Sequence, residues 1–378
     1  MRFAFEIRIK VVIKTIYLTA RRYALRGLHL LLSREKSIPV SESLRTILFI
    51  RVDRVGDMVL STPAFEAIKA AFPRAQLTVM ASKVNMSILK YNPHVDEVIV
   101  YDRSAILTEK IHFLKGLRRH HFDLAIDPCD DYELETAWIA WMSGATYRIG
   151  YAAYGREIFL NGPTPKIEAE KHFIDVTRDL LRFIGVTSDH YHPLIYLDES
   201  EQVWATKWLK EKGLQDKMLI AIHPGAHYET QRWPPKYHAE LIRLIRDRTK
   251  TEVILFGAPA DAGLIAKIQD MVQKPVHVSI ESDIRRFLAL LSRCRMLVCN
   301  NSGPLHCAAA LHVPTISFMG PTAKERWMPI GDMHHVLRID DLPCIGCNIG
   351  TCKIKTHDCM RLIRPEKVLQ IISEKING

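Results

Sequence analysis

The sequence predicts an α/β protein made of two halves, each built on a doubly wound parallel sheet. Apolar runs of strand length alternate with segments of helical periodicity in units of about thirty residues, the pattern of parallel βαβ folds. The alternation stops once, over residues 185–200, where Pro193 marks the expected linker. A chain of 378 residues is also long for one hydrophobic core, which favours two domains. Two such halves imply a cleft between them, where ligands usually bind.

The first half opens with the apolar, β-branched run 46–52, which is typical of a buried parallel strand. A helix is expected over residues 58–72, because its apolar positions repeat at close to the helical period. The same pattern predicts further strands at 76–81, 95–101 and 122–127 and helices at 84–90, 109–120, 133–142 and 171–184. In the second half it predicts strands at 218–222, 252–256, 296–299 and 315–318 and helices at 235–248, 260–271, 284–294 and 304–311.

Composition and pattern together divide the chain into three parts. Residues 1–44 form a basic, amphipathic N-terminal segment. Residues 45–190 form the first Rossmann-like domain, and residues 191–378 form the second, which ends in a cysteine-rich tail.

The most informative segment is Asn300-Asn301-Ser302-Gly303-Pro304-Leu305-His306, between an apolar strand and a helix of small residues. A buried strand that ends in such a turn and restarts as a helix directs backbone N–H groups and the positive end of the helix dipole at one point. That point suits a phosphate or diphosphate. Ser302 and Asn301 can add hydrogen bonds, and Gly303 permits close approach to the backbone. The alternative is an ordinary helix capped by Asn or Ser.

A second strand–turn–helix of this kind contains Asp53-Arg54-Val55-Gly56-Asp57. Asp57 falls in the first turn of the expected helix, just beyond the carboxyl edge of a strand, where open α/β sheets bind ligands. A carboxylate in this place acts either as a general base or only as a helix cap. Position alone leaves both interpretations open.

The positive charge of the chain is concentrated at the N-terminus. The formal net charge is +10, and residues 1–45 hold ten Lys or Arg against three Glu, which accounts for +7 of it. The remaining chain carries only +3 and has no basic stripe with interleaved aromatic residues, so a nucleic-acid groove is disfavoured.

The N-terminal segment is neither a signal peptide nor a membrane span, because its apolar stretches are short and interrupted by basic residues. Helical periodicity places one set of side chains on an apolar face, with basic residues roughly opposite and Leu18 and Leu25 as exceptions: Ile9, Ile13, Ile16, Ala20, Ala24 and Leu31 against Lys10, Lys14, Arg21 and Arg22. This pattern favours a helix lying on an anionic membrane surface. A helix that docks on the protein itself is the alternative.

Several motifs, in order, carry a family resemblance: Arg51-Val52-Asp53-Arg54-Val55-Gly56-Asp57, His223-Pro224-Gly225-Ala226, Arg232-Trp233-Pro234, Phe256-Gly257-Ala258-Pro259, Asn300–His306 and Gly320-Pro321-Thr322. In this order and spacing, from about residue 47 to 369, the chain resembles glycosyltransferase family 9, the heptosyltransferases of lipopolysaccharide core assembly. The resemblance implies the GT-B architecture of two facing Rossmann-like domains. It also implies that the N-terminal domain holds the acceptor and the C-terminal domain holds the nucleotide-sugar donor.

The resemblance further implies an inverting, metal-independent transfer of heptose from ADP-heptose to a lipopolysaccharide core or another lipid-linked glycan. In the family, the Asp after the Gly of the first loop is the base, which assigns that role to Asp57. Asp53, Arg54 and Gly56 then lie on the acceptor side. We expect a cytoplasmic protein, peripheral on the inner face of the cytoplasmic membrane.

On the donor side, the backbone around Ser302, Gly303 and Leu305 is expected to stabilise the departing diphosphate. The family places two basic residues before Trp-Pro, and this chain has Gln231 and Arg232, so the first is neutral. The resemblance also aligns Asp261 with a nucleoside contact, and the alternative is an acidic residue in the first turn of a helix. Asn301 stands where many members have Asp, which removes a charge and keeps the acceptor oxygen. His306 is either a hydrogen-bonded wall residue or a catalyst.

Four of the eight cysteines gather in the tail, at Cys344, Cys347, Cys352 and Cys359. No secretion signal is visible, so disulfides are not expected, and the alternatives are a structural zinc or free thiols in a compact loop. No Asp-x-Asp pair is placed to hold a catalytic metal.

Two other functions remain open beside heptosyl transfer. One is a GT-B glycosyltransferase that uses a different nucleotide sugar, and the other is a non-catalytic nucleotide-sugar-binding protein. An NAD-dependent enzyme is disfavoured, because neither strand–turn–helix has a G-x-G-x-x-G pattern. The sequence does not give the exact donor, the acceptor or the oligomeric state.

Overall fold

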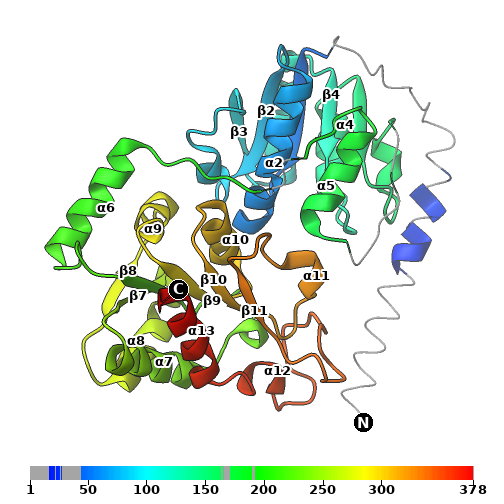
Figure 1. The fold of residues 1–378 in the computed structure, drawn as a ribbon. Helices are drawn as coiled ribbons and strands as arrows, with labels where there is room; N and C mark the ends of the chain where they lie inside the picture. The colour runs from blue at the N-terminus through cyan, green and yellow to red at the C-terminus, as the bar shows by residue number, and fades with distance from the viewer. Residues whose placement is uncertain are drawn as a thin grey trace. The chain divides into compact units, whose positions relative to one another are not determined.

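The computed structural model describes residues 17–21, 23–25, 27, 44–162, 165, 171–189 and 192–377. The chain forms two compact units, Met1–Tyr191 and His192–Gly378 (Figure 1). Each unit contains one sheet whose paired strands all run parallel, five strands in the first and six in the second. The predicted fold class, α/β with two doubly wound parallel sheets, is therefore confirmed.

The first sheet has the strand order β3-β2-β1-β4-β5. Its strands are β1 (Thr46–Arg51), β2 (Gln76–Ser82), β3 (Glu97–Tyr101), β4 (Leu124–Asp127) and β5 (Tyr147–Gly150), and its helices are α2 (Val55–Ala71), α3 (Leu107–Leu117), α4 (Glu135–Met142) and α5 (Phe173–Arg182). Strands β2 and β3 are added on one side of β1, and β4 and β5 on the other, so the strand order switches between β1 and β4. The ligand crevice of a doubly wound sheet is expected at the carboxyl ends of these two strands. Arg51 and Asp127 end these two strands.

The second sheet repeats the plan with the order β11-β10-β9-β6-β7-β8. Its strands are β6 (Leu219–His223), β7 (Glu252–Gly257), β8 (His277–Ile280), β9 (Met296–Asn300), β10 (Thr315–Phe318) and β11 (His335–Leu337), and its helices are α6 (Glu199–Glu211), α7 (Pro235–Arg248), α8 (Ala262–Val272), α9 (Ile284–Leu291), α10 (Gly303–Ala310), α11 (Lys324–Trp327), α12 (Asp358–Arg361) and α13 (Pro365–Asn377). The switch in strand order falls between β6 and β9, whose carboxyl ends are His223 and Asn300.

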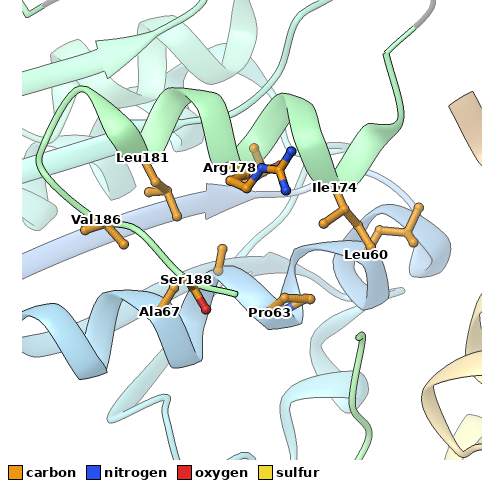
Figure 2. A pocket seen from close by; sticks show the side chains of 10 residues that line it. Leu60, Pro63, Ala67, Ile174, Arg178, Leu181, Val186 and Ser188 are labelled. Carbon is orange, nitrogen blue, oxygen red and sulfur yellow. The ribbon is translucent and has the colours of Figure 1, made fainter. Parts of the chain in front are cut away.

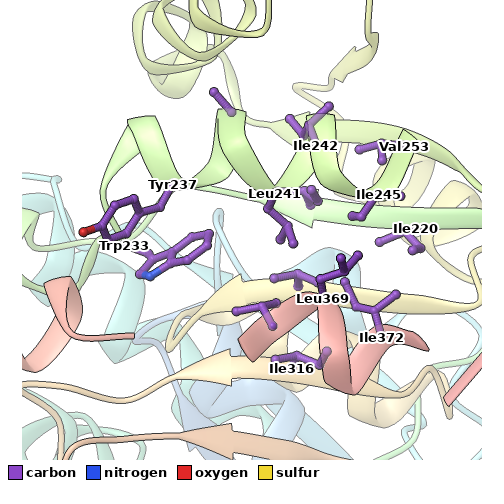
Figure 3. Close-up of a cluster of buried hydrophobic side chains, with 14 of the residues drawn as sticks. Ile220, Trp233, Tyr237, Leu241, Ile242, Ile245, Val253, Ile316, Leu369 and Ile372 are labelled. Carbon is purple, nitrogen blue, oxygen red and sulfur yellow. The ribbon is translucent and has the colours of Figure 1, made fainter. Parts of the chain in front are cut away.

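Apolar side chains from α7 and α13 cover one face of the second sheet (Figure 3). Leu241, Ile245 and Leu369 are among the buried members of this cluster. Trp233 lies in the same core, stacked on Phe318 at 4.5 Å, and its indole N–H donates to the Ile363 carbonyl at 2.9 Å. The core therefore fixes the start of α7, directly after Gln231 and Arg232.

Some expected elements differ from the structure. The helix predicted at 84–90 is only a 3₁₀ turn, Met86–Leu89, because the Asn85 side chain folds back to bond the backbone of β2 and β1. The helix predicted from residue 58 already begins at Val55, which places Asp57 at its third residue. Short strands β5, β8 and β11 were not predicted, since three or four residues of mixed polarity show no clear period.

Part of the N-terminal segment docks on the first unit. Leu18 is buried, and the Arg21 guanidinium donates to the carbonyls of Tyr154 and Tyr132 at 3.0 and 2.6 Å. Of the predicted apolar face, Ala20 and Ala24 are exposed, and the other members lie outside the described residues. No helix in the part of the chain that the structure describes is long and apolar enough to cross a membrane.

His238 generates a prediction about stability. It is fully buried beside Trp233, and neither ring nitrogen has a hydrogen-bond partner among the described residues. Burial, together with nearby His223, lowers the pKa of His238 to about 3. The folded protein therefore binds the proton of His238 less well than the unfolded chain does. The neutral side chain contributes its full stability above the unfolded pKa of about 6.5, and the protein loses stability as the pH falls below that value.

We predict that His238→Leu makes the protein less sensitive to acid. The difference in unfolding free energy between variant and wild type should grow in favour of the variant below pH 6.5, by at most about 1.4 kcal/mol per pH unit. Urea unfolding between pH 8 and pH 5 measures this difference. A difference that does not change with pH would show that His238 is not held neutral.

Candidate active site

Asp57 stands at the carboxyl edge of the first sheet, in the first turn of α2. Its Oδ2 accepts a hydrogen bond from the backbone N–H of Arg54 at 3.3 Å, so the carboxylate caps the helix. The side chain is half-buried. Gly56 is buried in the same turn, and Arg54 is exposed beside it. The cap and a chemical role are compatible, because one carboxylate oxygen remains available for a substrate.

The environment of Asp57 favours its neutral form. Burial, followed by the negative charge of Asp53, raises the pKa of Asp57 to about 7, while Arg51 and Arg54 oppose the shift. A carboxylate with a pKa near 7 is a stronger base than an ordinary Asp and is still largely ionised at slightly alkaline pH. The site thus has a group suited to removing a proton from a hydroxyl.

Arg51 and Asp53 form an ion pair whose charges act on Asp57. The buried Arg51 Nη1 donates to Asp53 Oδ2 at 2.9 Å, and its guanidinium lies 4.9 Å from the centre of the Phe173 ring. The loop backbone is held by Asn85, a fully buried residue whose amide donates to the carbonyls of Arg51 at 3.0 Å and Asp53 at 3.3 Å. Sequence patterns did not identify Asn85.

Asp127 ends the neighbouring strand β4 and is committed to a structural role. It is completely buried and accepts a hydrogen bond from Arg156, whose guanidinium also donates to Thr136 Oγ1 at 3.0 Å and to the Glu133 carbonyl. Burial raises the pKa of Asp127 and the Arg156 charge opposes that shift. Because a buried carboxylate in such a network does not reach a substrate hydroxyl, Asp57 is the better candidate base.

A small crevice lies between α2 and α5 of the same unit (Figure 2). Leu60, Pro63 and Ile174 are among its mainly apolar lining residues, which include no carboxylate. It is therefore a packing feature and does not provide a base for glycosyl transfer.

In the second unit, Asn300 connects three loops at the carboxyl edge of the sheet. Its side chain is fully buried, accepts from the Trp233 N–H at 2.8 Å, and donates to the carbonyls of Pro224 and Gly225 at 2.8 and 3.3 Å. The end of β9, the loop after β6 and the start of α7 are thereby held together. Asn300 was part of the motif, but its role was not predicted.

The predicted phosphate turn begins α10. Ser302 is the N-cap residue, and Gly303 starts the helix, followed by Pro304. The Leu305 amide donates to the Ser302 carbonyl at 3.0 Å, and its side chain is buried. Leu305 is therefore a less suitable backbone donor to a ligand than predicted, which leaves the amides of Ser302 and Gly303, at the positive end of the helix dipole, as the better donors.

Asn301 and His306 flank this turn and are both buried. The backbone N–H of Asn301 donates to the Phe318 carbonyl at 3.3 Å, which joins β9 to β10. The His306 ring lies 6.3 Å from that of Trp327. His306 is therefore buried near Trp327, and its role at the site stays a prediction.

Gln231 and Arg232 lie in the loop before α7. Arg232 donates through Nε and Nη2 to the Ala226 carbonyl at 3.1 and 3.0 Å. Gln231 donates through Nε2 to Thr322 Oγ1 at 3.2 Å and accepts from the Tyr228 N–H at 3.3 Å. The neutral residue thus connects two of the motifs, since Thr322 belongs to Gly320-Pro321-Thr322.

Asp261 approaches the loop after β6. Its Oδ2 accepts from the Ala258 N–H at 3.1 Å, and a β-carbon on Gly225 would lie 2.6 Å from its Oδ1. A side chain at position 225 would therefore displace the Asp261 carboxylate. The structure gathers Asp261, Asn300, Ser302 and Arg232 at one edge of one sheet, whereas Asp57 belongs to the other unit.

The tail cysteines are reduced in the structure. Cys359 is buried, and burial, followed by the charges of Cys344, Cys347 and Cys352, raises its pKa to about 11. Within the described ranges, however, no three His, Cys, Asp or Glu side chains are arranged to hold a metal ion.

The sequence model of glycosyltransferase family 9 (heptosyltransferase) matches residues 111–357. The chain belongs to glycosyltransferase family 9. It is 25% identical over 352 residues to lipooligosaccharide heptosyltransferase 2 of Haemophilus ducreyi, covering 87% of this chain and 98% of that protein.

Two solved structures share the fold. A glycosyltransferase family 9 protein from Veillonella parvula has a TM-score of 0.77 at 22% identity, covering 88% of this chain and 97% of the other. The E. coli ADP-heptose LPS heptosyltransferase II has a TM-score of 0.71 at 23% identity, covering 87% and 98%. The resemblance inferred from the motifs is confirmed at the level of family and fold.

We predict that Asp57→Asn folds normally and loses at least about 10²-fold in turnover, because an amide cannot accept the proton of an attacking hydroxyl. Since Asn caps helices about as well as Asp, and the raised pKa of Asp57 opposes folding of its ionised form, the variant should be at least as stable as wild type at pH 8. Single-turnover kinetics and thermal unfolding measure both effects. Near-normal turnover would make Asp57 only a helix cap.

Ser302→Trp provides the converse variant. A large side chain at the start of α10 should block the phosphate turn, weaken donor binding and leave the Asp57 loop unchanged, because the two lie in different units. Isothermal titration with the donor nucleotide separates the variants: Asp57→Asn should keep wild-type affinity and Ser302→Trp should not.

Proposed function

We propose that this protein transfers a heptose or a related sugar from a nucleoside-diphosphate donor, ADP-heptose in the first instance, to a lipopolysaccharide core or another lipid-linked glycan. The observation that supports this most is Asp57, a carboxylate with a pKa near 7 at the switch point of the first sheet, in a chain of the heptosyltransferase family. In the second unit, Ser302 and Gly303 begin α10, and a helix start of this kind suits a diphosphate leaving group.

In the proposed reaction, Asp57 removes the proton from the acceptor hydroxyl as its oxygen attacks C1 of the donor sugar. The new C–O bond forms on the face opposite the diphosphate, and the bond between C1 and the diphosphate oxygen breaks, so that its electron pair leaves with the nucleoside diphosphate. A single displacement of this kind inverts the anomeric configuration. Asp53, Arg54 and Gly56 are the acceptor-side residues of this proposal, with Asp53 acting on the pKa of Asp57.

The leaving diphosphate is stabilised without a metal in this proposal. The amides of Ser302 and Gly303, the dipole of α10 and the charge of Arg232 would bind its oxygens, while Gln231 contributes hydrogen bonds but no charge. Loss of one such preorganised donor typically costs about 10²–10³-fold in rate. Asp261, Asn301 and His306 would line the nucleotide-sugar site, with Leu305 packing behind the turn.

A donor screen tests the proposal. Purified protein is incubated with ADP-heptose, other ADP-sugars, UDP-sugars and GDP-sugars, with a lipid-linked acceptor and EDTA present, and nucleoside diphosphate is measured. We expect acceptor-dependent release of ADP from ADP-heptose. Release from a UDP- or GDP-sugar alone would support the alternative donor that Gln231 suggests, and donor binding without release from any sugar would support a non-catalytic binding protein.

Zinc at the tail cysteines remains a prediction. Four thiols at Cys344, Cys347, Cys352 and Cys359 have the chemistry of a structural zinc site. Protein purified without chelator should then contain about one zinc per chain by elemental analysis. Less than about half a zinc per chain would leave a cluster of free thiols.

We further propose that residues 1–40 bring the enzyme to an anionic membrane surface, at the inner face of the cytoplasmic membrane. Each basic residue near such a surface contributes about 1 kcal/mol. The docking of Arg21 on Tyr132 and Tyr154 leaves Tyr17 and Tyr23 exposed, so docking and membrane contact are compatible.

Deletion of residues 1–40 should abolish sedimentation with anionic vesicles at low salt and leave activity on a soluble acceptor fragment intact. Vesicles of neutral lipid serve as the control. Equal sedimentation of the full-length and shortened proteins would contradict this role of the segment.

A further inference from the structure

The loop of residues 344–357, which carries three of the four tail cysteines, contacts Thr230, the residue before Gln231. Thr230 Oγ1 donates to the Ile349 carbonyl at 2.6 Å, and His357 Nε2 lies 2.7 Å from the Thr230 carbonyl. The Tyr228 ring packs on the same loop, since a β-carbon on Gly350 would lie 3.0 Å from its Cδ1. Thr230 is buried, and both its hydroxyl and its carbonyl are bonded to residues of this loop.

The same loop also holds the partner of Gln231. The Gly346 amide donates to the Gly320 carbonyl at 3.2 Å, and the Asn348 amide donates to the Pro321 carbonyl at 2.6 Å. Thr322, the next residue, receives the hydrogen bond of Gln231 at 3.2 Å. Loop 344–357 thus contacts the segments on both sides of the Gln231–Thr322 hydrogen bond.

Because Gln231 is neutral, the contacts that hold its backbone would affect how well it binds a diphosphate. A charged side chain attracts a diphosphate over several ångströms in many orientations, whereas an amide contributes only through directed hydrogen bonds. The contribution of Gln231 to diphosphate binding therefore depends on how accurately its backbone is held. The hydrogen bonds between Thr230 and loop 344–357 hold the backbone next to Gln231 in place.

His357 is the residue of the loop best placed for this task. Its backbone has φ of 55°, in the left-handed region that few residues other than glycine adopt, so the surroundings hold it there. Its ring is half-buried, and Nε2 must carry a proton to donate to the Thr230 carbonyl. Loss of this donor would leave the carbonyl before Gln231 without the contact that fixes it.

We infer that loop 344–357 is a positioning element of the donor site, in which His357 acts through Thr230 to orient Gln231 toward the diphosphate of the donor. The inference rests on the proposed function only for the identity of the ligand. It gives the cysteine-rich loop a role in donor binding, whatever the state of its thiols.

The test compares three single substitutions in the full-length protein. His357→Asn keeps a residue that tolerates a left-handed backbone but is too short to reach Thr230, and His357→Gln keeps an N–H near the position of Nε2. Lys355→Asn is the matched control, because Lys355 lies two residues away, is exposed and has φ of 59°. Affinities for ADP and AMP are measured by isothermal titration.

We expect His357→Asn to weaken ADP binding about tenfold and AMP binding much less, since the contact acts on the diphosphate. His357→Gln and Lys355→Asn should bind ADP within about twofold of wild type, a difference of less than 0.5 kcal/mol by that conversion. Equal ADP affinities of His357→Asn and Lys355→Asn, or equal losses for ADP and AMP, would overturn the inference.

Hydrogen exchange of the ligand-free protein separates this inference from the proposed function. The amides of residues 230–232 should exchange faster in His357→Asn than in Lys355→Asn. If wild-type protein binds no ADP, the proposed donor is wrong, and exchange then decides alone: unchanged exchange at these amides would overturn the positioning role, and faster exchange would support it.

Discussion

The carboxyl edge of the first sheet holds more carboxylates than guanidinium groups bonded to them, and this imbalance raises the pKa of Asp57. Three carboxylates, Asp53, Asp57 and Asp127, share this edge with two buried guanidinium groups, those of Arg51 and Arg156. Arg156 is bonded to Asp127 and Arg51 to Asp53, so among the described residues Asp57 has no guanidinium of its own. Desolvation without a paired cation favours the neutral acid, which is why the pKa of Asp57 rises.

The carboxyl edge of the second sheet is held together mainly by hydrogen bonds of neutral side chains. In the proposed function, the donor diphosphate brings its own negative charge, so the protein would have to supply N–H groups and one positive charge in fixed positions. Asn300 fixes three loops with its side-chain amide, and Gln231 joins Thr322 in the same way. Because neutral hydrogen bonds are directional, this edge depends on accurate backbone placement, which the core around Trp233 and the loop of residues 344–357 provide.

The parts that sequence patterns predicted are those set by local chemistry. Long apolar runs such as 46–52 and 296–299 identify central strands, and a polar turn before a helical pattern locates the starts of α2 and α10, beside Asp57 and Ser302. The predicted loop–helix motifs also lie at the two switch points, because strand order in doubly wound sheets follows general rules. Element bounds were less accurate, and α6, the C-terminal helices α11, α12 and α13, and the short strands at the sheet edges were missed.

What sequence patterns did not predict depends on partners far along the chain. Asn85 bonds the carbonyl of a residue 34 positions earlier, Asn300 reaches back 76 positions, and His357 contacts Thr230 across 127. An isolated Asn or His has many possible roles, and only the folded contacts select one. The same holds for Leu305, whose amide is engaged by Ser302 in a way that the motif alone does not reveal.

The pH dependence of kcat/KM in wild type and in Asp53→Asn tests the central claim most directly. This quantity reports the pKa of the essential base in the free enzyme. For wild type we expect the rate to fall about tenfold per pH unit below an apparent pKa near 7, as Asp57 becomes protonated. Asp53→Asn removes a negative charge beside Asp57, so its acid limb should move to lower pH. An acid limb at the same pH in both proteins would contradict the account, because Asp57 would then not be the titrating base that Asp53 perturbs.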